Sequence, residues 1–230
     1  MVKKKDTTEE RIVAVEEALS KSEQFIEKNQ KILTYVVVGI IVVILLFFGY
    51  KKYISGPKEK TALSMMYTAE IYFEKDSVDL ALFGDGESYG FMDIIDDYGS
   101  TSAGNLAKYY AGICYFNKGE YEESIKYLKK FNGDDVIVPG MALGAIGDAY
   151  VQIDDLEKAA KYYMDAANKN ENDFITPTFL MKAGWTYELL EQWDNAKGTY
   201  EKIKKEYPRS REARDIDKYL ARAKVKLGEI

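Results

Sequence analysis

The sequence contains no histidine, one cysteine and only four prolines among its 230 residues. Without histidine, no imidazole can serve as a general base, as a member of a catalytic triad or as a metal ligand. The single cysteine, Cys114, excludes an internal disulfide framework and a cysteine-rich zinc site. The net charge of −6 disfavours binding to nucleic acid. These absences favour a binding or scaffolding role over an enzyme, with no cofactor and no metal.

Charge is also missing from one continuous stretch, residues 32–50. As a helix with a rise of about 1.5 Å per residue, this stretch would be roughly 28 Å long, close to the hydrocarbon thickness of a bilayer. A soluble core helix would carry regular polar positions, and a cleaved signal sequence would have a shorter apolar region and a small-residue cleavage site. We therefore expect an uncleaved transmembrane helix over residues 32–50, followed by a linker over residues 51–60.

The segment before this span, residues 1–31, carries seven basic and seven acidic residues. Thr7 and Glu10 have the spacing of a capping box. Apolar residues then recur near the helical period at Ile12, Val15, Leu19 and Ile26. The pattern predicts a charged amphipathic helix that lies on the membrane, docks on a partner or simply continues the span. Its basic residues favour a cytoplasmic N-terminus, although the lysines close to the span are nearly balanced on its two sides.

A pattern of small residues and tyrosines recurs three times after residue 60. Each copy has a glycine, then a tyrosine, then a small residue nine positions after the tyrosine: Gly112, Tyr115 and Ser124; Gly147, Tyr150 and Ala159; Gly184, Tyr187 and Ala196. The copies are offset by 35 and 37 residues. Small residues at these positions allow two antiparallel helices to approach closely. A degenerate fourth copy begins at Ala69, and residues 75–90 are expected to separate its two helices.

The offsets and the internal pattern resemble the tetratricopeptide repeat (TPR), whose period is 34 residues. After Pro208, apolar residues recur at helical spacing between charges, which indicates a capping helix from about residue 210. The sequence thus predicts an all-α protein: a single N-terminal transmembrane helix, then a TPR α-solenoid of about four helix pairs over residues 61–230 with a C-terminal capping helix.

The combination of a short charged segment, one span and TPRs resembles the membrane-anchored TPR proteins typified by the ancillary subunit of the bacterial Sec translocon. The resemblance implies a single-pass protein of the bacterial inner membrane, with a cytoplasmic N-terminus and periplasmic repeats. It implies a chaperone-like role in protein transport, with translocon subunits and exported polypeptides as partners. Two alternatives stay open: a scaffold for cell-envelope complex assembly, and a cytoplasmic adaptor if the orientation is reversed.

In a TPR array the first helices of successive repeats line a concave groove, which is the usual recognition surface. The repeat register assigns eight residues to this groove: Met66, Phe73, Tyr109, Ile113, Phe116, Asp148, Met181 and Trp185. Methionine and aromatic side chains suit adaptable binding of apolar peptide segments. Alternatively, some of them, especially Ile113 and Phe116, pack against a neighbouring repeat.

Enzymatic alternatives find little support in the sequence. Asp76, Asp79, Asp85 and Glu87 could suggest a calcium loop, but their spacing is not that of an EF-hand, and a solvated insertion fits better. Cys114 lacks the histidine base that usually activates a cysteine nucleophile. We therefore expect no catalytic residues.

The predicted orientation is testable by a fusion. A reporter that is active only outside the cytoplasm, joined after residue 230, should be active because the repeats are expected in the periplasm. Fluorescence from a reporter that works only in the cytoplasm would instead support the cytoplasmic adaptor.

Overall fold

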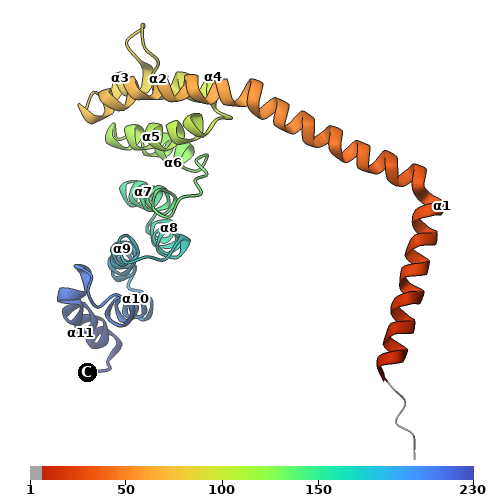
Figure 1. Ribbon diagram of the computed structural model, residues 1–230. Helices are drawn as coiled ribbons and strands as arrows, with labels where there is room; N and C mark the ends of the chain where they lie inside the picture. The colour runs from red at the N-terminus through yellow and green to blue at the C-terminus, as the bar shows by residue number, and fades with distance from the viewer. Residues whose placement is uncertain (1–6) are drawn as a thin grey trace, which may run out of the picture. The chain divides into compact units, whose positions relative to one another are not determined.

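The computed structural model describes the backbone of residues 7–230 and the side chains of residues 25–230 (Figure 1). Every regular element in this part of the chain is a helix, so the predicted all-α class is confirmed. The chain divides into two compact units, Met1–Pro57 and Lys58–Ile230.

The first unit contains the long helix α1, Thr7–Tyr50. Between residues 25 and 74 the chain has one helical stretch long and apolar enough to cross a membrane, and none of its apolar window is buried within the protein. Signal sequences satisfy the same criterion. The side chains that would form the predicted capping box and amphipathic face, from Thr7 to Leu19, lie outside the described residues.

Residues 51–60, expected as a linker, are helical. Lys51–Ser55 form a π-helical turn, η1, and α2 follows at once over Gly56–Glu74. The N–H of Gly56 donates to the carbonyl of Lys51, five residues earlier. Pro57 lacks an N–H, and its ring would clash with the carbonyl four residues earlier in a regular α-helix. The wider π turn accommodates this proline, so the helix continues through it.

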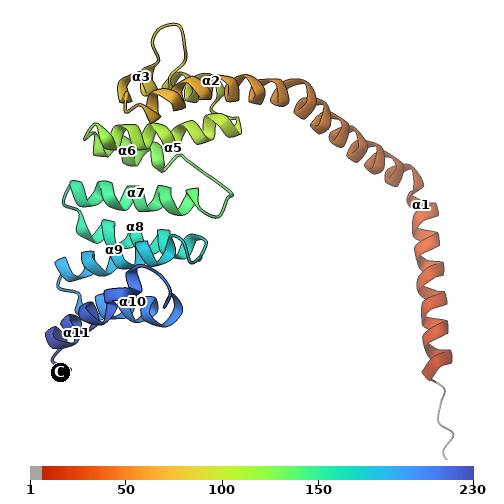
Figure 2. The same ribbon diagram turned by 60° about the vertical axis from the view of Figure 1, so that its left-hand side comes forward.

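The second unit is a series of antiparallel helix pairs. After α2 come α3 (Val78–Phe83), α4 (Phe91–Tyr98), α5 (Ser102–Asn117), α6 (Tyr121–Leu128), α7 (Val138–Gln152), α8 (Leu156–Lys169), α9 (Thr176–Leu189), α10 (Trp193–Glu206), the 3₁₀ turn η2 (Glu212–Asp215) and α11 (Ile216–Leu227). Figure 2 shows α5 to α10 stacked in chain order. Each pair can bury its apolar stripe only against the next pair, which is the logic of a repeat array.

The same tight turn joins the first helix to the second in all four repeats. In each turn the carbonyl of a tyrosine accepts a hydrogen bond from the N–H five residues later, at 2.8 or 2.9 Å; these tyrosines are Tyr72, Tyr115, Tyr150 and Tyr187. A residue with positive φ completes each turn: Asp76, Gly119, Asp154 and Glu191. This is the Schellman arrangement, in which a left-handed residue lets the last carbonyls of a helix find donors.

This common turn corrects the expectation for the first repeat. Its extra residues were predicted between its two helices, yet α3 starts directly after the turn, as the second helix does in every other repeat. The insertion, residues 84–90, instead interrupts the second helix and divides it into α3 and α4. Gly84 and Gly90 close its base: a Cβ on Gly90 would lie 2.3 Å from the carbonyl oxygen of Leu82.

One carboxylate organises the inserted loop. Asp85 accepts a hydrogen bond from the hydroxyl of Tyr72 at 2.6 Å and two more from the backbone N–H groups of Glu87 and Ser88. These hydrogen bonds lower the pKa of Asp85 to about 2, and the bond from Tyr72 has the largest effect. Asp85 is therefore engaged in holding the loop to the first helix of its repeat.

Within each of the three regular repeats, the two helices meet at the glycine of the repeat pattern. A Cβ on Gly112 would lie 2.5 Å from the Leu128 side chain. The corresponding distances are 2.7 Å from Gly147 to Tyr163 and 2.3 Å from Gly184 to Tyr200. No side chain fits at these points, so the absence of a Cβ sets how closely the paired helices approach.

Two hydrophobic cores result from this packing. The first core joins α2 to α6 and includes Met66, Phe91 and Cys114. The second core runs from α6 to α11 and includes Met181 and Leu220. Both belong to the unit of residues 58–230, and α6 contributes to each of them.

Side-chain hydrogen bonds fix the start of α5 and the start of the C-terminal segment. The carboxylate of Glu59 in α2 accepts hydrogen bonds from the N–H groups of Ser102 and Ala103, at 2.7 and 3.0 Å, and so satisfies the first turn of α5. The Ser210 hydroxyl accepts from the N–H of Ala213 at 3.1 Å and begins the C-terminal segment.

The glycine contacts generate a prediction about stability. Gly147→Leu should lower the free energy of unfolding by about 3 kcal/mol, because the side chain would overpack the contact with Tyr163. Gly198→Ala is the matched control: it lies within α10 with nothing within 4 Å of its Cβ position, and should stabilise by up to about 1 kcal/mol. Both are measured by denaturant unfolding, and equal shifts in the two variants would contradict the assigned packing.

Candidate protein-binding groove

A hollow of about 670 Å³ lies along the first helices of three successive repeats. We call it the groove. Its lining comes from α5 (Tyr109, Ile113, Phe116), α7 (Met141, Ala145, Asp148), α9 (Thr178, Phe179, Lys182), two loops (Asp173, Phe174, Ile175, Ser210, Arg211) and the start of η2 (Glu212). Positions three and four apart lie on one face of a helix, so each of the three helices presents one stripe to the groove.

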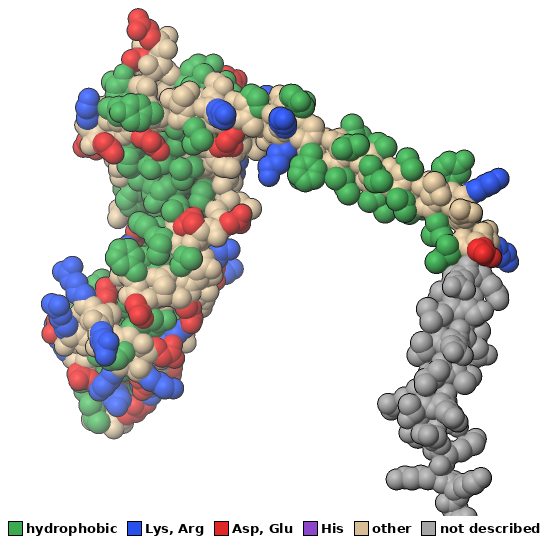
Figure 3. Space-filling model, viewed as in Figure 1, with side chains coloured by type: hydrophobic (Ala, Val, Ile, Leu, Met, Phe, Trp, Pro, Cys, Tyr) green, Lys and Arg blue, Asp and Glu red, His purple; other side chains and the backbone are tan. Residues whose placement is uncertain are grey.

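The α5 end of the groove is apolar. Figure 3 shows hydrophobic side chains gathered over α5. Tyr109 lies against Phe131, with ring centroids 5.6 Å apart, and Phe116 lies against Tyr121. Burial raises the pKa of the Tyr109 hydroxyl above its usual value.

Phe174 is the most exposed large apolar side chain of the groove, at 76 %. It lies in the loop between α8 and α9, where the side chain of Asn172 accepts hydrogen bonds from the N–H groups of Phe174 and Ile175. This turn holds Phe174 at the rim while Ile175 enters the second core. An exposed phenylalanine on an ordered turn is available to a partner at low conformational cost.

A polar cluster occupies the middle of the groove. Lys182 donates to both oxygens of Asp148, at 2.7 and 2.8 Å, across neighbouring repeats. The hydroxyl of Tyr163 donates to the same carboxylate at 2.5 Å. Burial, followed by this hydrogen bond, raises the pKa of Tyr163 far above its usual range. The carboxylate is therefore fixed by two donors and joins one repeat to the next.

The C-terminal edge of the groove carries further charge. Thr178 donates to Glu212 at 2.9 Å, which ties α9 to η2. Arg211 is exposed and has no ion-pair partner among residues 25–230. Among the described residues, the groove thus combines an apolar end, an ion-paired centre and two exposed charges of opposite sign at its rim, Arg211 and Asp173, neither of which has an ion-pair partner.

Four of the eight residues assigned to the groove from sequence line it: Tyr109, Ile113, Phe116 and Asp148. Their role in binding stays a prediction. The other four lie elsewhere. Met66 and Met181 are only 2 % and 5 % exposed and belong to the two cores. Phe73 packs against Tyr110, with ring centroids 5.3 Å apart. Trp185 is 44 % exposed, but its ring lies beside Tyr219 of α11 and outside the groove lining.

These differences have one physical origin. The register identifies equivalent helix positions, but the neighbouring elements decide whether a position is open. Met181 occupies in α9 the position of Tyr109 in α5, and it shares its core with Ile216 and Leu220 of α11. Sequence reasoning also missed Met141, Phe174 and Lys182. Phe174 had a recognisable signal, because it is the first large apolar residue after a polar stretch, Asn168 to Asp173.

The remaining reactive group, Cys114, lies in the first core and away from the groove. Burial raises the pKa of its thiol to about 12, so it stays protonated at neutral pH. Residues 25–230 contain no group of three or more His, Cys, Asp and Glu side chains that could hold a metal ion.

Comparisons with known proteins agree with this geometry. Two sequence families, both described as tetratricopeptide repeats, match residues 106–133 and 179–210 in one case and residues 142–173 in the other. The chain is a TPR-repeat protein. The three matched segments correspond to the pairs α5/α6, α7/α8 and α9/α10, and the interrupted first repeat lies outside them. A search of curated proteins gives no match.

Two solved structures share the fold. A crystal structure of the MamA protein has 19 % sequence identity and a TM-score of 0.51, covering 74 % of this chain and 93 % of MamA. TPR-like repeats of a kinesin light chain from Podosopora anserina have 13 % identity and a TM-score of 0.51, covering 72 % and 86 %. At these identities the likeness extends to the TPR arrangement of helices and not to function.

The cluster around Asp148 generates a second stability prediction. Asp148→Ala should lower the free energy of unfolding by about 1–2 kcal/mol, because Lys182 and the buried hydroxyl of Tyr163 would lose their acceptor. The control is Asp217→Ala, which breaks a pair with Lys204 in which both side chains are more than half exposed, and should change stability by less than about 0.5 kcal/mol. The free energy of unfolding of both variants is measured by thermal or urea unfolding. An equal loss of stability in the two variants would show that the groove cluster has no special stabilising role.

Proposed function

We propose that this protein is a membrane-anchored, non-catalytic TPR scaffold that binds apolar polypeptide segments through the groove. The observation that carries the proposal is the exposure of Phe174 together with Met141 beside the apolar side chains of α5. Contiguous exposed apolar surface, rimmed by polar residues, is typical of sites that bind other proteins. Its methionine and aromatic composition suits segments of varied sequence.

The state of the groove's ionisable groups supports binding rather than acid–base chemistry. Asp148 is already paired with Lys182 and Tyr163, and Glu212 accepts from Thr178. A general base needs a free acceptor directed at its substrate, whereas Asp148 bonds one repeat to the next and Glu212 bonds η2 to α9. TPR proteins are typically non-catalytic scaffolds, and the repeats imply protein partners.

The arrangement of the chain supports a location at a membrane. An apolar helix long enough to span a bilayer precedes the repeats directly, as in the Sec-associated proteins that the sequence resembles. We place the repeats in the periplasm, close to the translocon, with exported polypeptides and translocon subunits as partners. The net charge of the chain, −6, would also suit unfolded, basic segments. A scaffold for cell-envelope assembly would use the same groove for a few folded partners.

Site-specific photocrosslinking tests this function. A photoreactive amino acid at Phe174 in the intact protein should give many crosslinked products if the groove takes passing polypeptides, and one or two discrete products if it holds envelope partners. The control position is Leu189, which is also largely exposed but does not line the groove. Equal product patterns at positions 174 and 189 would show that the groove is not the binding surface.

A further inference from the structure

The outer face of α2 is apolar and uncovered. Leu63 and Tyr67 are 54 % and 66 % exposed, and they lie one turn apart on the same face of the helix. The equivalent residues of the second repeat are Leu106 and Tyr110, and both pack against the first core. In the third and fourth repeats the equivalent positions, Met141 and Ala145 in α7 and Thr178 and Lys182 in α9, line the groove instead. In α2, the first helix of the array, Leu63 and Tyr67 are exposed, unlike Leu106 and Tyr110.

The charges beside these two residues are arranged symmetrically. Lys60 lies one turn before Leu63, and Glu70 one turn after Tyr67, on the same face of α2. A twofold axis midway between Leu63 and Tyr67 also lies midway between Lys60 and Glu70. An antiparallel pair of α2 helices therefore sets Leu63 against Tyr67 and Lys60 against Glu70, twice over.

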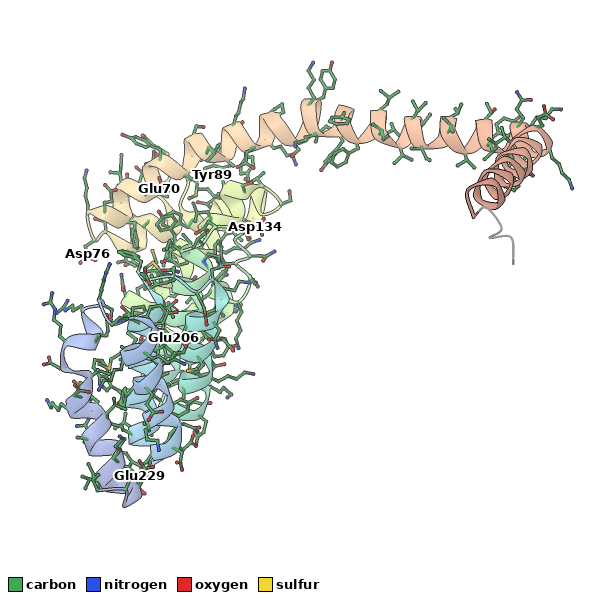
Figure 4. The ribbon with its side chains drawn as sticks, turned by 60° about the horizontal axis from the view of Figure 1, so that its bottom comes forward. Glu70, Asp76, Tyr89, Asp134, Glu206 and Glu229 are labelled. Carbon is green, nitrogen blue, oxygen red and sulfur yellow. The ribbon has the colours of Figure 1, made fainter. Side chains whose placement is uncertain are left out.

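Neither charge is satisfied within the described part of the chain. Lys60 and Glu70 have no ion-pair partner among residues 25–230. Glu70, labelled on α2 in Figure 4, is half-buried, and burial together with the neighbouring Glu74 raises the pKa of its carboxyl. A cation supplied from outside would offset both effects.

We propose that the outer face of α2 is a self-association surface, on which a second copy of this chain packs its own α2 in antiparallel orientation through Lys60, Leu63, Tyr67 and Glu70. Such an interface is isologous, so a single patch supplies both sides and the association closes at two copies. The apolar pair provides the buried centre, and the two Lys60–Glu70 pairs fix the antiparallel register. The groove, on other elements, stays open to its partners.

Charge reversal in the full-length protein tests the register. Lys60→Glu alone places glutamates opposite one another, and Glu70→Lys alone places lysines opposite one another, so each variant should associate with itself roughly tenfold more weakly or worse. Mixing the two variants restores both pairs and should give a heterodimer of wild-type affinity. The mass of the detergent-solubilised proteins, measured at matched concentrations in low salt, provides the readout.

Several results would overturn the proposal. The first is a wild-type protein that stays monomeric at concentrations up to about 100 μM. The second is a dimer that persists in both single variants, as association through α1 would give. The third is a mixture of the two variants that stays monomeric although each variant retains wild-type helicity and melting temperature. If either variant is misfolded, cysteine crosslinking decides instead. A mixture of the Leu63→Cys variant with the Tyr67→Cys variant should form an intermolecular disulfide on mild oxidation. The Val225→Cys variant, whose cysteine would be similarly exposed on α11, should not form one with a second copy of itself. Equal crosslinking at both sites, or none at α2, contradicts the pairing.

Discussion

The contact between a glycine on one helix and a large side chain on its partner sets the geometry of the repeat array. At Gly112, Gly147 and Gly184 a Cβ would come within 2.7 Å or less of the side chain opposite. The helices of each pair can therefore approach as closely as their backbones allow, and that spacing repeats along the chain. Stacking the pairs then brings the first helices side by side, which is what creates the groove.

The same contact also positions the chemistry of the groove. The ring of Tyr163 lies over Gly147, and its hydroxyl reaches Asp148, the next residue along α7. Tyr200 repeats the arrangement one pair later: its ring lies over Gly184 and its hydroxyl donates to Glu188 at 2.9 Å. Each tyrosine thus fills a helix contact with its apolar body and fixes a carboxylate with its polar tip.

How much of the structure the sequence could predict depends on whether a feature is local. The repeats were predictable because the glycines and tyrosines mark contacts and turns that recur within each helix pair. The groove was only half predictable, since exposure at Met181 or Trp185 depends on how the C-terminal helix packs against the last pair. The π turn before Pro57 could not be predicted, because it substitutes one helical hydrogen-bonding pattern for another without a change in apolar periodicity. The split between α3 and α4 could not be placed, because α3 has only six residues and is too short to show a helical period.

The loop between α3 and α4 shows how a repeat can acquire new sequence without losing its core. Gly84 and Gly90 bring the two ends of the loop together, and the helix that they interrupt still buries Leu82 on one side and Phe91 on the other. The residues between them are anchored to the repeat mainly through Asp85 and Tyr72. Because the ends meet whatever the length between them, an epitope or a fluorescent domain inserted at Gly86 would label the array while leaving its helix pairs in register.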